Sequence, residues 1–438
     1  MPFTAAVYTL GCKVNQYESE AICERLQLLQ IQILPPEEKA DVYIINTCTV
    51  TAEADRKARQ FIRRAIAQNP EAYILVAGCY SQASPDAVST IQGVDYICGT
   101  RNKMTIPDKV MELLRKGSKN EKPEINVSSL QASLEKMDIR TFGRTRCYIK
   151  IEDGCENHCA YCAIPLARGP VSSRPESEIE EEINRILRDG CREIVLTGIE
   201  VASYGKDTGS SLVDLLEQVD AIEGMVQFRL SSIDPSVMRA DLVTRLAGLK
   251  HLAPHFHLSL QSGSSSVLVG MKRKYNADQA SAAMNRIRAA IPDVQFTADI
   301  ITGFPGETEE LFEETMQFVR SNPLLHIHVF PYSGRKGTAA VSFPHQVPEN
   351  IRRERASRLI ALGEQIKSQL LETQLGRTVS VLVESWKSGI CTGHTPNFFE
   401  VSFPSAVDLR GEQVKVVIHS HNDKICLGEL CVQTRKEG

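Results

Sequence analysis

A short run of cysteines carries the clearest chemical signal in the sequence. Cys155, Cys159 and Cys162 lie within eight residues and directly follow a segment with the composition of a strand. Three thiolates at this spacing can bind one metal centre. A zinc ion would require a fourth ligand, whereas a [4Fe–4S] cluster held by three cysteines keeps one iron open for a substrate or cofactor. The alternatives are three unrelated core cysteines or a zinc knuckle completed by His158, and the spacing favours the cluster.

A second set of three cysteines is dispersed along the sequence. Cys12, Cys48 and Cys79 each come two or three residues after a segment that we expect to be a strand. The carboxyl ends of parallel strands meet at one edge of a sheet, where α/β proteins bind ligands, so we expect the three thiols to converge. Buried structural cysteines are the alternative, but the same placement three times indicates a second [4Fe–4S] cluster with an open iron. The other cysteines are interpreted as packing or incidental residues: Cys23, Cys98, Cys147, Cys191, Cys391, Cys426 and Cys431.

The first part of the chain must supply a sheet that positions the dispersed cysteines. Short apolar segments alternate with helix-length amphipathic segments, which predicts a parallel α/β sheet. The expected strands are Ala5–Leu10, Val42–Ile45, Tyr73–Ala77 and Val94–Ile97, and the expected helices are Glu18–Leu29 and about Glu53–Ala67. The polar stretch Lys116–Leu134 is interpreted as a linker.

The middle of the chain must supply the strand that precedes the local cysteine run. Six strand–helix units of this kind favour an open or partial barrel, whose active residues lie after the carboxyl ends of the strands. The expected strands are Cys147–Ile151, Glu193–Thr197, Gln227–Ser231, His255–Leu260, Gln295–Ile301 and His326–Phe330, with helices such as Glu176–Arg188 and Glu309–Arg320 between them.

The last part of the chain changes from helix to strand. After a helix over Glu349–Gln374, short β segments separated by glycines predict a small all-β module of the five-strand barrel kind. The expected strands are Thr378–Glu384, Phe398–Phe403, Gln413–His419 and Lys424–Val432.

Composition places the chain among ordinary globular proteins. It has 438 residues, 42% of them hydrophobic and 24% charged, with a formal net charge of −4. This length favours two or three domains, and the net charge does not by itself indicate a nucleic-acid partner. The sequence has no apolar run long enough for a membrane span and no secretory signal. We therefore expect a cytoplasmic protein, in which 13 cysteines indicate metal binding or catalysis more than disulfides.

The spacing of Cys155, Cys159 and Cys162 resembles the CxxxCxxC motif of the radical S-adenosylmethionine (SAM) superfamily. The resemblance implies a [4Fe–4S] cluster that donates an electron to SAM and cleaves it to methionine and a 5′-deoxyadenosyl radical, while the protein positions the radical and excludes water. By the same resemblance, SAM would contact the family's aromatic residue and several residues at strand ends. These are Tyr161 and Phe330 near adenine, Thr197 and Gly198 near the methionyl amine, and Ser232 and Gln261 near ribose or carboxylate.

With both cysteine sets and the β module, the whole chain resembles the radical SAM methylthiotransferases. The resemblance implies an N-terminal methylthiotransferase domain (1–118), a linker (119–140), a radical SAM barrel (141–372) and a TRAM domain (373–438). It also implies replacement of a C–H bond by C–S–CH3, with one SAM as methyl donor, a second as radical source, and the sulfur held by the N-terminal cluster. Further matches are Ile164-Pro165, Ala167-Arg168-Gly169, Ser173-Arg174 and the segment Gly303–Thr308.

The segment Thr9–Glu18, which reads Thr-Leu-Gly-Cys-Lys-Val-Asn-Gln-Tyr-Glu, resembles the MtaB type. That type modifies N6-threonylcarbamoyladenosine at position 37, next to the tRNA anticodon, to its 2-methylthio derivative. The MiaB type, which acts on isopentenyl-adenosine, usually has Gly-Cys-Gln-Met-Asn there, and the RimO type, which acts on an aspartate of a ribosomal protein, usually has Gly-Cys-Pro-Lys-Asn. Arg335–Ala340 departs from the MtaB pattern, in which Thr-Gly-Thr-Pro-Ala is more frequent.

Two basic regions are candidates for tRNA binding. The helix after Cys48 includes Arg59, Arg63 and Arg64, and the β module includes Lys415 with nearby aromatic residues. Such groups bind phosphates and stack on bases, but a solvated helix face and aromatics that fill the barrel core are alternatives. A non-catalytic iron–sulfur RNA-binding protein is the competing function of another class. The expected partners are tRNA, an electron donor such as flavodoxin or ferredoxin, and an unidentified sulfur donor, with no membrane.

Overall fold

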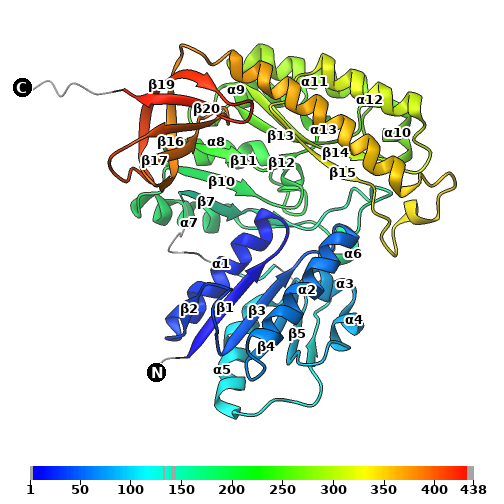
Figure 1. Cartoon of the computed structure of the whole chain (residues 1–438), viewed down its shortest axis with the longest axis vertical. Coiled ribbons are helices and arrows are strands. Elements are labelled where there is room, and N and C mark those ends of the chain that lie inside the picture. The colour runs from blue at the N-terminus through cyan, green and yellow to red at the C-terminus, as the bar shows by residue number, and fades with distance from the viewer. Residues whose placement is uncertain (1–2, 132–133, 138, 140–144, 432–438) are drawn as a thin grey trace, which may run out of the picture.

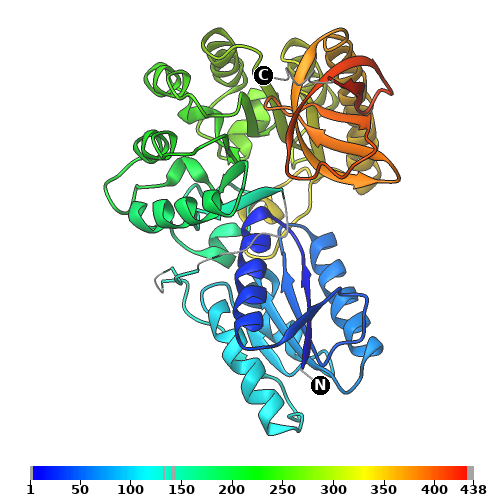
Figure 2. The ribbon, with the colours of Figure 1, turned by 90° about the vertical axis from the view of Figure 1, so that its left-hand side faces the viewer.

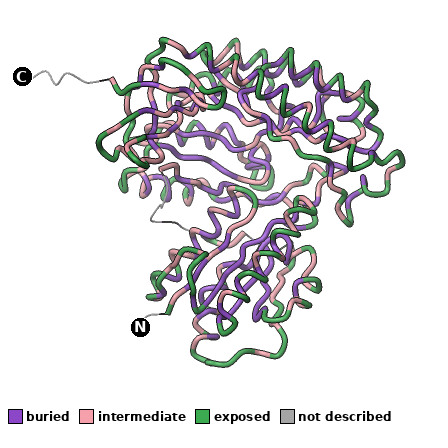
Figure 3. Tube along the Cα trace, in the orientation of Figure 1, coloured by how far each residue is buried: buried purple, intermediate pink, exposed green. Residues whose placement is uncertain are grey.

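The computed structural model describes residues 3–131, 134–137, 139 and 145–431. An N-terminal α/β sheet lies at one end of the long axis, and an open barrel and a small closed barrel lie side by side at the other (Figures 1 and 2). Buried segments follow the strands, and exposed segments follow the outer turns of the helices (Figure 3). The fold is therefore the α/β architecture with a C-terminal β module that the sequence predicts.

The N-terminal sheet has six parallel strands in the order β2-β1-β3-β4-β5-β6. Their bounds are Gln32–Leu34, Thr4–Thr9, Val42–Thr47, Tyr73–Gly78, Tyr96–Cys98 and Glu124–Asn126. The helices are α1 (Lys13–Leu28), α2 (Ala52–Gln68), α3 (Cys79–Ala83), α4 (Pro85–Ser89), the 3-10 turn η1 (Lys103–Thr105) and α5 (Ile106–Lys116). Strands β3 and β4 are buried along their whole length because α2 packs on one face and α1 and α5 on the other. Sheets covered on both faces carry continuous apolar strands, which is why these two were predictable.

One interpretation from the sequence is wrong in part. The polar stretch taken as a linker contains strand β6, which pairs in parallel with β5. Only three residues long and mostly exposed, this edge strand has no apolar signature. Residues 132, 133, 138 and 140–144, which fall in the expected linker and the start of the expected barrel domain, lie outside the described residues.

The central strands are parallel and run in sequence order around an open barrel. One sheet is β7 (Arg146–Lys150), β10 (Glu193–Thr197) and β11 (Phe228–Leu230); the next is β12 (Ser232–Ile233), β13 (His255–Gln261), β14 (Gln295–Thr302) and β15 (His326–Pro331). Ser231 alone separates β11 from β12, so the two sheets form one curved wall. The larger covering helices are α7 (Glu176–Arg188), α8 (Leu212–Asp220), α9 (Ala240–Ala247), α10 (Ser265–Gly270), α11 (Ala277–Ala290), α12 (Glu309–Ser321) and α13 (Glu349–Glu372). The largest apolar core lies between these helices and the strands.

The C-terminal strands form a closed barrel in the order β16-β17-β18-β20-β19. Their bounds are Thr378–Lys387, Ile390–His394, Glu400–Pro404, Cys426–Leu430 and Gln413–His421. Phe399 and Phe403 are buried in its core, so these two aromatic side chains fill the barrel. Val432, the end of the last expected strand, lies outside the described residues.

A buried ion network joins the N-terminal sheet domain to the open barrel. Glu18 of α1 accepts hydrogen bonds from Lys103, from Lys150 of β7 (2.7 Å) and from Arg168 of α6 (Ile164–Arg168; 2.7 Å). Asp153, in the short strand β8 (Glu152–Asp153), accepts from Lys150 (2.6 Å) and Arg168 (2.8 Å). The five side chains are at most 3% exposed. Because each charge would be costly to bury alone, the network fixes how the two parts meet.

Candidate active site

The barrel cysteines lie in the loop that leads from β8 to α6. Gly154 begins this turn with φ +85°, and a Cβ there would lie 1.9 Å from the Pro170 carbonyl oxygen. Only glycine fits that close approach. The backbone then places Cys155, Cys159 and Cys162 around one cavity of about 310 Å³.

Hydrogen-bond donors point at all three sulfur atoms. The backbone N–H groups of Asn157 and Ile164 donate to Cys155 and Cys162 at 3.5 Å. The Arg273 guanidinium donates to the Cys159 Sγ at 3.4 Å. Burial raises the pKa of Cys155 to about 11 and that of Cys162 to about 12, so a bound metal must displace protons from these thiols. Donors aimed at sulfur stabilise thiolates that ligate iron, and the residues therefore fit a [4Fe–4S] cluster.

The wall of this cavity has polar atoms without partners. Glu200 Oε1, Arg273 Nε and Tyr332 Oη are buried with no hydrogen-bond partner among the described residues, and all three residues line the cavity. Burial, and next the Asp234 charge, raise the pKa of Glu200 to about 7. Buried polar atoms are normally paired, so these three fit a polar ligand such as SAM.

Five of the six residues expected to contact SAM line the same cavity as the barrel cysteines. They are Tyr161, Gly198, Ser232, Gln261 and Phe330. Thr197 instead lines the neighbouring cavity, and its carbonyl accepts the Ile151 N–H at 2.8 Å. Gln261 has φ +64° at a β-bulge, a strained backbone of the kind that accompanies ligand sites.

The dispersed cysteines converge at the carboxyl edge of the N-terminal sheet. Cys12 precedes α1, Cys48 follows β3 and Cys79 begins α3. A Cβ on Gly11, which has φ +93°, would lie 2.9 Å from the Cys48 Sγ. Burial, and next the neighbouring Cys79, raise the pKa of Cys48 to about 12.

An arginine donates a hydrogen bond to a sulfur atom of this triad, as Arg273 does to one of the barrel cysteines. Arg168 Nε donates to the Cys79 Sγ at 3.4 Å, while its other nitrogens hold the ion network at the domain junction. Cys12 lines the cavity of the barrel cysteines. One cysteine of the dispersed set therefore opens onto the cavity that all three barrel cysteines line, and the arrangement fits a second cluster that opens toward the first.

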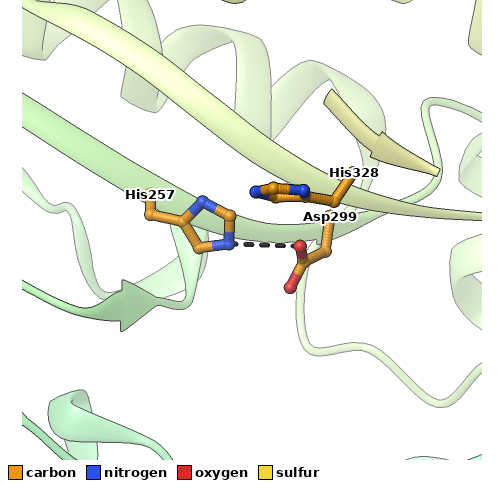
Figure 4. A group of neighbouring side chains, drawn as sticks. All are labelled: His257, Asp299 and His328. Carbon is orange, nitrogen blue, oxygen red and sulfur yellow. Dashed lines mark ion pairs between the residues drawn. The ribbon is translucent and has the colours of Figure 1, made fainter. Parts of the chain in front are cut away.

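A group of possible metal ligands that the sequence analysis did not identify lies inside the barrel (Figure 4). His257 Nε2 lies 3.2 Å from Asp299 Oδ1, and the ligand atoms of these two residues and of His328 all lie within 4.8 Å of one another. Among the described residues no cysteine triad meets this criterion. At least two sulfur atoms of each triad therefore lie more than 4.8 Å apart.

The three residues belong to a polar cavity of about 660 Å³ between the open barrel, α1 and the C-terminal barrel. Its wall includes residues two apart on three successive strands: His255 and His257, Thr297 and Asp299, and His326 and His328. Residues at this spacing share one face of a strand. These repeated polar pairs are the sequence signal for a polar barrel interior.

The candidate tRNA-binding residues lie in separate places. Arg59 donates to the Tyr80 hydroxyl at 3.2 Å and lines a groove with Arg56, Lys57, Arg352 and Arg353. Arg63 and Arg64 are exposed one turn further along α2, and Lys415 is exposed on β19. Arg59, Arg63 and Arg64 thus lie on one helix, and Lys415 lies on another module.

Two cysteines interpreted as incidental are bonded to each other. Cys147 on β7 and Cys191 before β10 form a disulfide, with Cα atoms 6.7 Å apart. They are 44 residues apart in sequence, and only the pairing of β7 with β10 brings them together. The other described cysteines are free.

Comparison with known proteins agrees with this geometry. Residues 4–99 match a family described as Uncharacterized protein family UPF0004, and residues 149–319 match the Radical SAM superfamily. Threonylcarbamoyladenosine tRNA methylthiotransferase MtaB of Bacillus subtilis is 38% identical and covers 95% of this chain and 93% of its own. Its namesake in Thermotoga maritima is 36% identical, covering 91% of each chain.

The chain is also similar to more distant proteins. The tRNA-2-methylthio-N(6)-dimethylallyladenosine synthase of Syntrophotalea carbinolica is 32% identical over 93% of this chain and 95% of its own. Among solved structures, the radical SAM methyltransferase TsrM from Kitasatospora setae has a TM-score of 0.55 at 13% identity, over 90% of this chain and 77% of that one, which shows a shared fold. No helix in the described part of the chain has the length and hydropathy of a membrane span.

Proposed function

Because the chain belongs to the radical SAM tRNA methylthiotransferases, and within them to the MtaB type, we propose that it methylthiolates tRNA at N6-threonylcarbamoyladenosine 37, using SAM and two [4Fe–4S] clusters. The observation that carries the proposal is the shared cavity, onto which Cys12 opens together with Cys155, Cys159 and Cys162. A reaction that joins a carbon radical to a sulfur atom needs both centres within reach of one substrate carbon.

When bound, the barrel cluster would supply the electron that cleaves SAM, and the N-terminal cluster would supply the sulfur. The residues of the chain would hold the cluster and orient SAM. Arg273 and the Asn157 and Ile164 N–H groups stabilise the sulfur ligands of the barrel cluster. Glu200 and Tyr332 offer unpartnered polar atoms to SAM, and Tyr161 offers an aromatic surface for its adenine.

Two alternatives use the same chemistry on other substrates. The dimethylallyladenosine synthases among the relatives carry names for an apolar N6 substituent, and an aspartate of a ribosomal protein is the substrate of the RimO type. The polar barrel interior, with its four histidines and Asp299, supports a polar substituent over an apolar one.

The experiment is a reconstituted reaction. Protein loaded anaerobically with iron and sulfide, SAM and a strong reductant is incubated with anticodon stem-loops carrying threonylcarbamoyl-adenosine, isopentenyl-adenosine or unmodified adenosine at position 37. We expect roughly eight irons per chain and a methylthio product from the first RNA. Product from the isopentenyl RNA alone, or four irons in fully loaded protein, would overturn the proposal.

A further inference from the structure

The polar cavity between the two barrels has buried polar atoms that lack a hydrogen-bond partner among the described residues. Arg229 Nη1, Ser231 Oγ and His255 Nδ1 have no hydrogen-bond partner among the described residues, and all three residues line this cavity. Their side chains are more than nine-tenths buried. Buried polar atoms left unpaired cost stability, so this wall is built for a polar ligand.

The charged groups on this wall include cationic donors that no carboxylate engages. Arg146 is paired with Glu384 at 3.0 Å, and Arg229 is held by Glu193 at 2.7 Å through its Nε. Lys13, the first residue of α1, lines the same cavity. Its ammonium has no hydrogen-bond or ion-pair partner in the described part of the chain. Asp299 and Glu400 are the carboxylates that line the cavity. Lys13 and the free Nη1 of Arg229 therefore present uncommitted cationic donors.

The C-terminal barrel closes this end of the cavity with a strained residue. Phe398 has φ +78°, which is unfavourable for a bulky side chain. Its ring stacks on His255 at 4.3 Å and on His394 at 4.8 Å, with the Arg229 guanidinium 4.8 Å from its centroid. Arg229 Nη2 also donates to the Pro396 carbonyl at 3.0 Å. Arg229 is thus rigidly placed, and its remaining donors need no reorganisation to bind a ligand.

This cavity adjoins the one that holds the barrel cysteines. Gly198, Ser232, Asp299 and Phe330, together with Cys12, line both. In adenine, C2 and C6, which carries N6, are the two ring atoms on either side of N1. An adenine bound at this shared wall can therefore place its C2 toward the cysteines. Its N6 substituent then extends into the polar cavity.

We propose that Lys13 and Arg229 form a subsite for the carboxylate of an amino-acid substituent on N6 of the substrate adenine. The inference rests on the proposed function and deepens it. Lys13 supplies a point charge and Arg229 Nη1 supplies directed N–H donors, a combination suited to a carboxylate. The subsite selects a base with an anionic N6 substituent over one with an apolar alkenyl group, because the apolar group would leave these donors desolvated and unpaired.

The test compares two RNAs that differ in one charge. Both are anticodon stem-loops with threonylcarbamoyl-adenosine at position 37, and in one the threonine carboxylate is converted to the carboxamide. Dissociation constants are measured with cluster-loaded protein, without turnover, alongside the rate of methylthiolation. Wild-type protein should bind the acid about tenfold more tightly than the amide, or more, as expected for a charge-assisted hydrogen bond.

Three variants locate the preference. Lys13→Gln should bind the acid as weakly as the amide, and Lys13→Arg should restore part of the difference. Arg229→Lys keeps a positive charge against Glu193 but removes the free Nη1, and it should reduce the preference in the same way. Lys250→Gln removes one exposed lysine outside the cavity and should leave the acid-to-amide ratio unchanged.

The controls separate this subsite from the function on which it rests. Iron content and 5′-deoxyadenosine production are measured in each variant because Lys13 adjoins Cys12. If Lys13→Gln loses iron, Arg229→Lys carries the test, since Arg229 lies in β11. If wild-type protein methylthiolates neither RNA, the proposed function fails while the binding ratio still judges the subsite. Equal affinity of wild-type protein for acid and amide, or an unchanged ratio in both Lys13→Gln and Arg229→Lys, would overturn the subsite.

Discussion

At Gly11 the backbone passes so close to Cys48 that a methyl group does not fit. The residue has φ +93°, and a Cβ would lie 2.7 Å from the Cys48 Cβ and 2.9 Å from its Sγ. We expect Gly11→Ala to displace Cys12 from Cys48 and to lower the iron content by about half, since one of two clusters would be lost. Gly117→Ala is the matched control, because Gly117 has φ +66° with nothing within 4 Å. Full iron content in Gly11→Ala would contradict convergence of these cysteines on a cluster.

A substitution of Arg273 tests whether this side chain supports the barrel cluster. It donates to the Cys159 Sγ at 3.4 Å and is fixed by Asp234 at 2.6 Å. Arg273→Met should lower 5′-deoxyadenosine production about tenfold, the usual effect of losing a hydrogen bond from a charged group, while Arg273→Lys retains part of the activity. The measurement is 5′-deoxyadenosine per iron under strong reductant. Unchanged production in Arg273→Met would show that this contact does not serve the cluster.

Residues were predictable where their chemistry was local. Cys155, Cys159 and Cys162 can be recognised as a set from their spacing, and Cys12 from its position after a predicted strand. Arg229 and His255 did not stand out, because an arginine and a histidine within strands have many ordinary roles. Their significance comes from unpartnered atoms in a cavity, which only three-dimensional contacts reveal.

The basic residues of helix α2 lead to a prediction about tRNA binding. Arg59, Arg63 and Arg64 lie on the helix that begins just after Cys48, and the start of that helix faces the barrel (Figure 1). If they contact phosphates, changing all three to Gln should weaken tRNA binding and reduce the slope of log affinity against log salt by about 2 to 3.

The control for α2 is a triple variant on the other side of the sheet, in which Arg115, Lys116 and Lys122 become Gln. These exposed residues lie at and beyond the end of α5, so their loss should leave the salt slope unchanged. Affinity is measured by titrating tRNA at several salt concentrations. Equal slopes for wild type and the α2 variant would move the RNA surface to another element, with Lys415 on β19 the next residue to test.

Elements were predictable in proportion to their burial. Strands β3 and β4, with every residue buried, stand out as apolar segments. Strand β6, with two of three residues exposed, has no such signature, and its polar surroundings favoured a linker. Pairing between distant strands, which brings Cys147 to Cys191, was equally beyond a reading of local composition.

For the whole molecule, the ion network predicts how stability depends on pH. Burial alone would raise the pKa of Glu18, but the charges of Arg168, Lys103 and Lys150 hold it well below its ordinary value. The pKa of Asp153 is likewise lowered, since Arg168 and Lys150 outweigh burial. A carboxylate with a lowered folded-state pKa stabilises the fold above its unfolded pKa of about 4, and this contribution is lost as pH falls through the folded value.

Glu18→Gln should therefore destabilise the protein at pH 7 by about 3 kcal/mol, because buried cations lose a partner. The variant should also lose less stability than wild type when pH is lowered below 4. Thermal unfolding followed by circular dichroism at pH 7 and in acid measures both effects. Glu223→Gln, at an exposed position, should change stability by no more than about 0.5 kcal/mol. A Glu18→Gln variant as stable as wild type at pH 7 would mean that the network does not hold the junction.

The central claim, methylthiolation of threonylcarbamoyl-adenosine in tRNA by two cysteine-bound clusters, is tested most directly by mass spectrometry of tRNA nucleosides. Cells without this gene should lack the 2-methylthio derivative of N6-threonylcarbamoyladenosine and accumulate the unmethylthiolated nucleoside. The wild-type gene should restore the derivative, whereas Cys79→Ala and Cys159→Ala variants should not. Persistence of the derivative in cells without the gene, or loss of a methylthio group from isopentenyl-adenosine instead, would contradict the account.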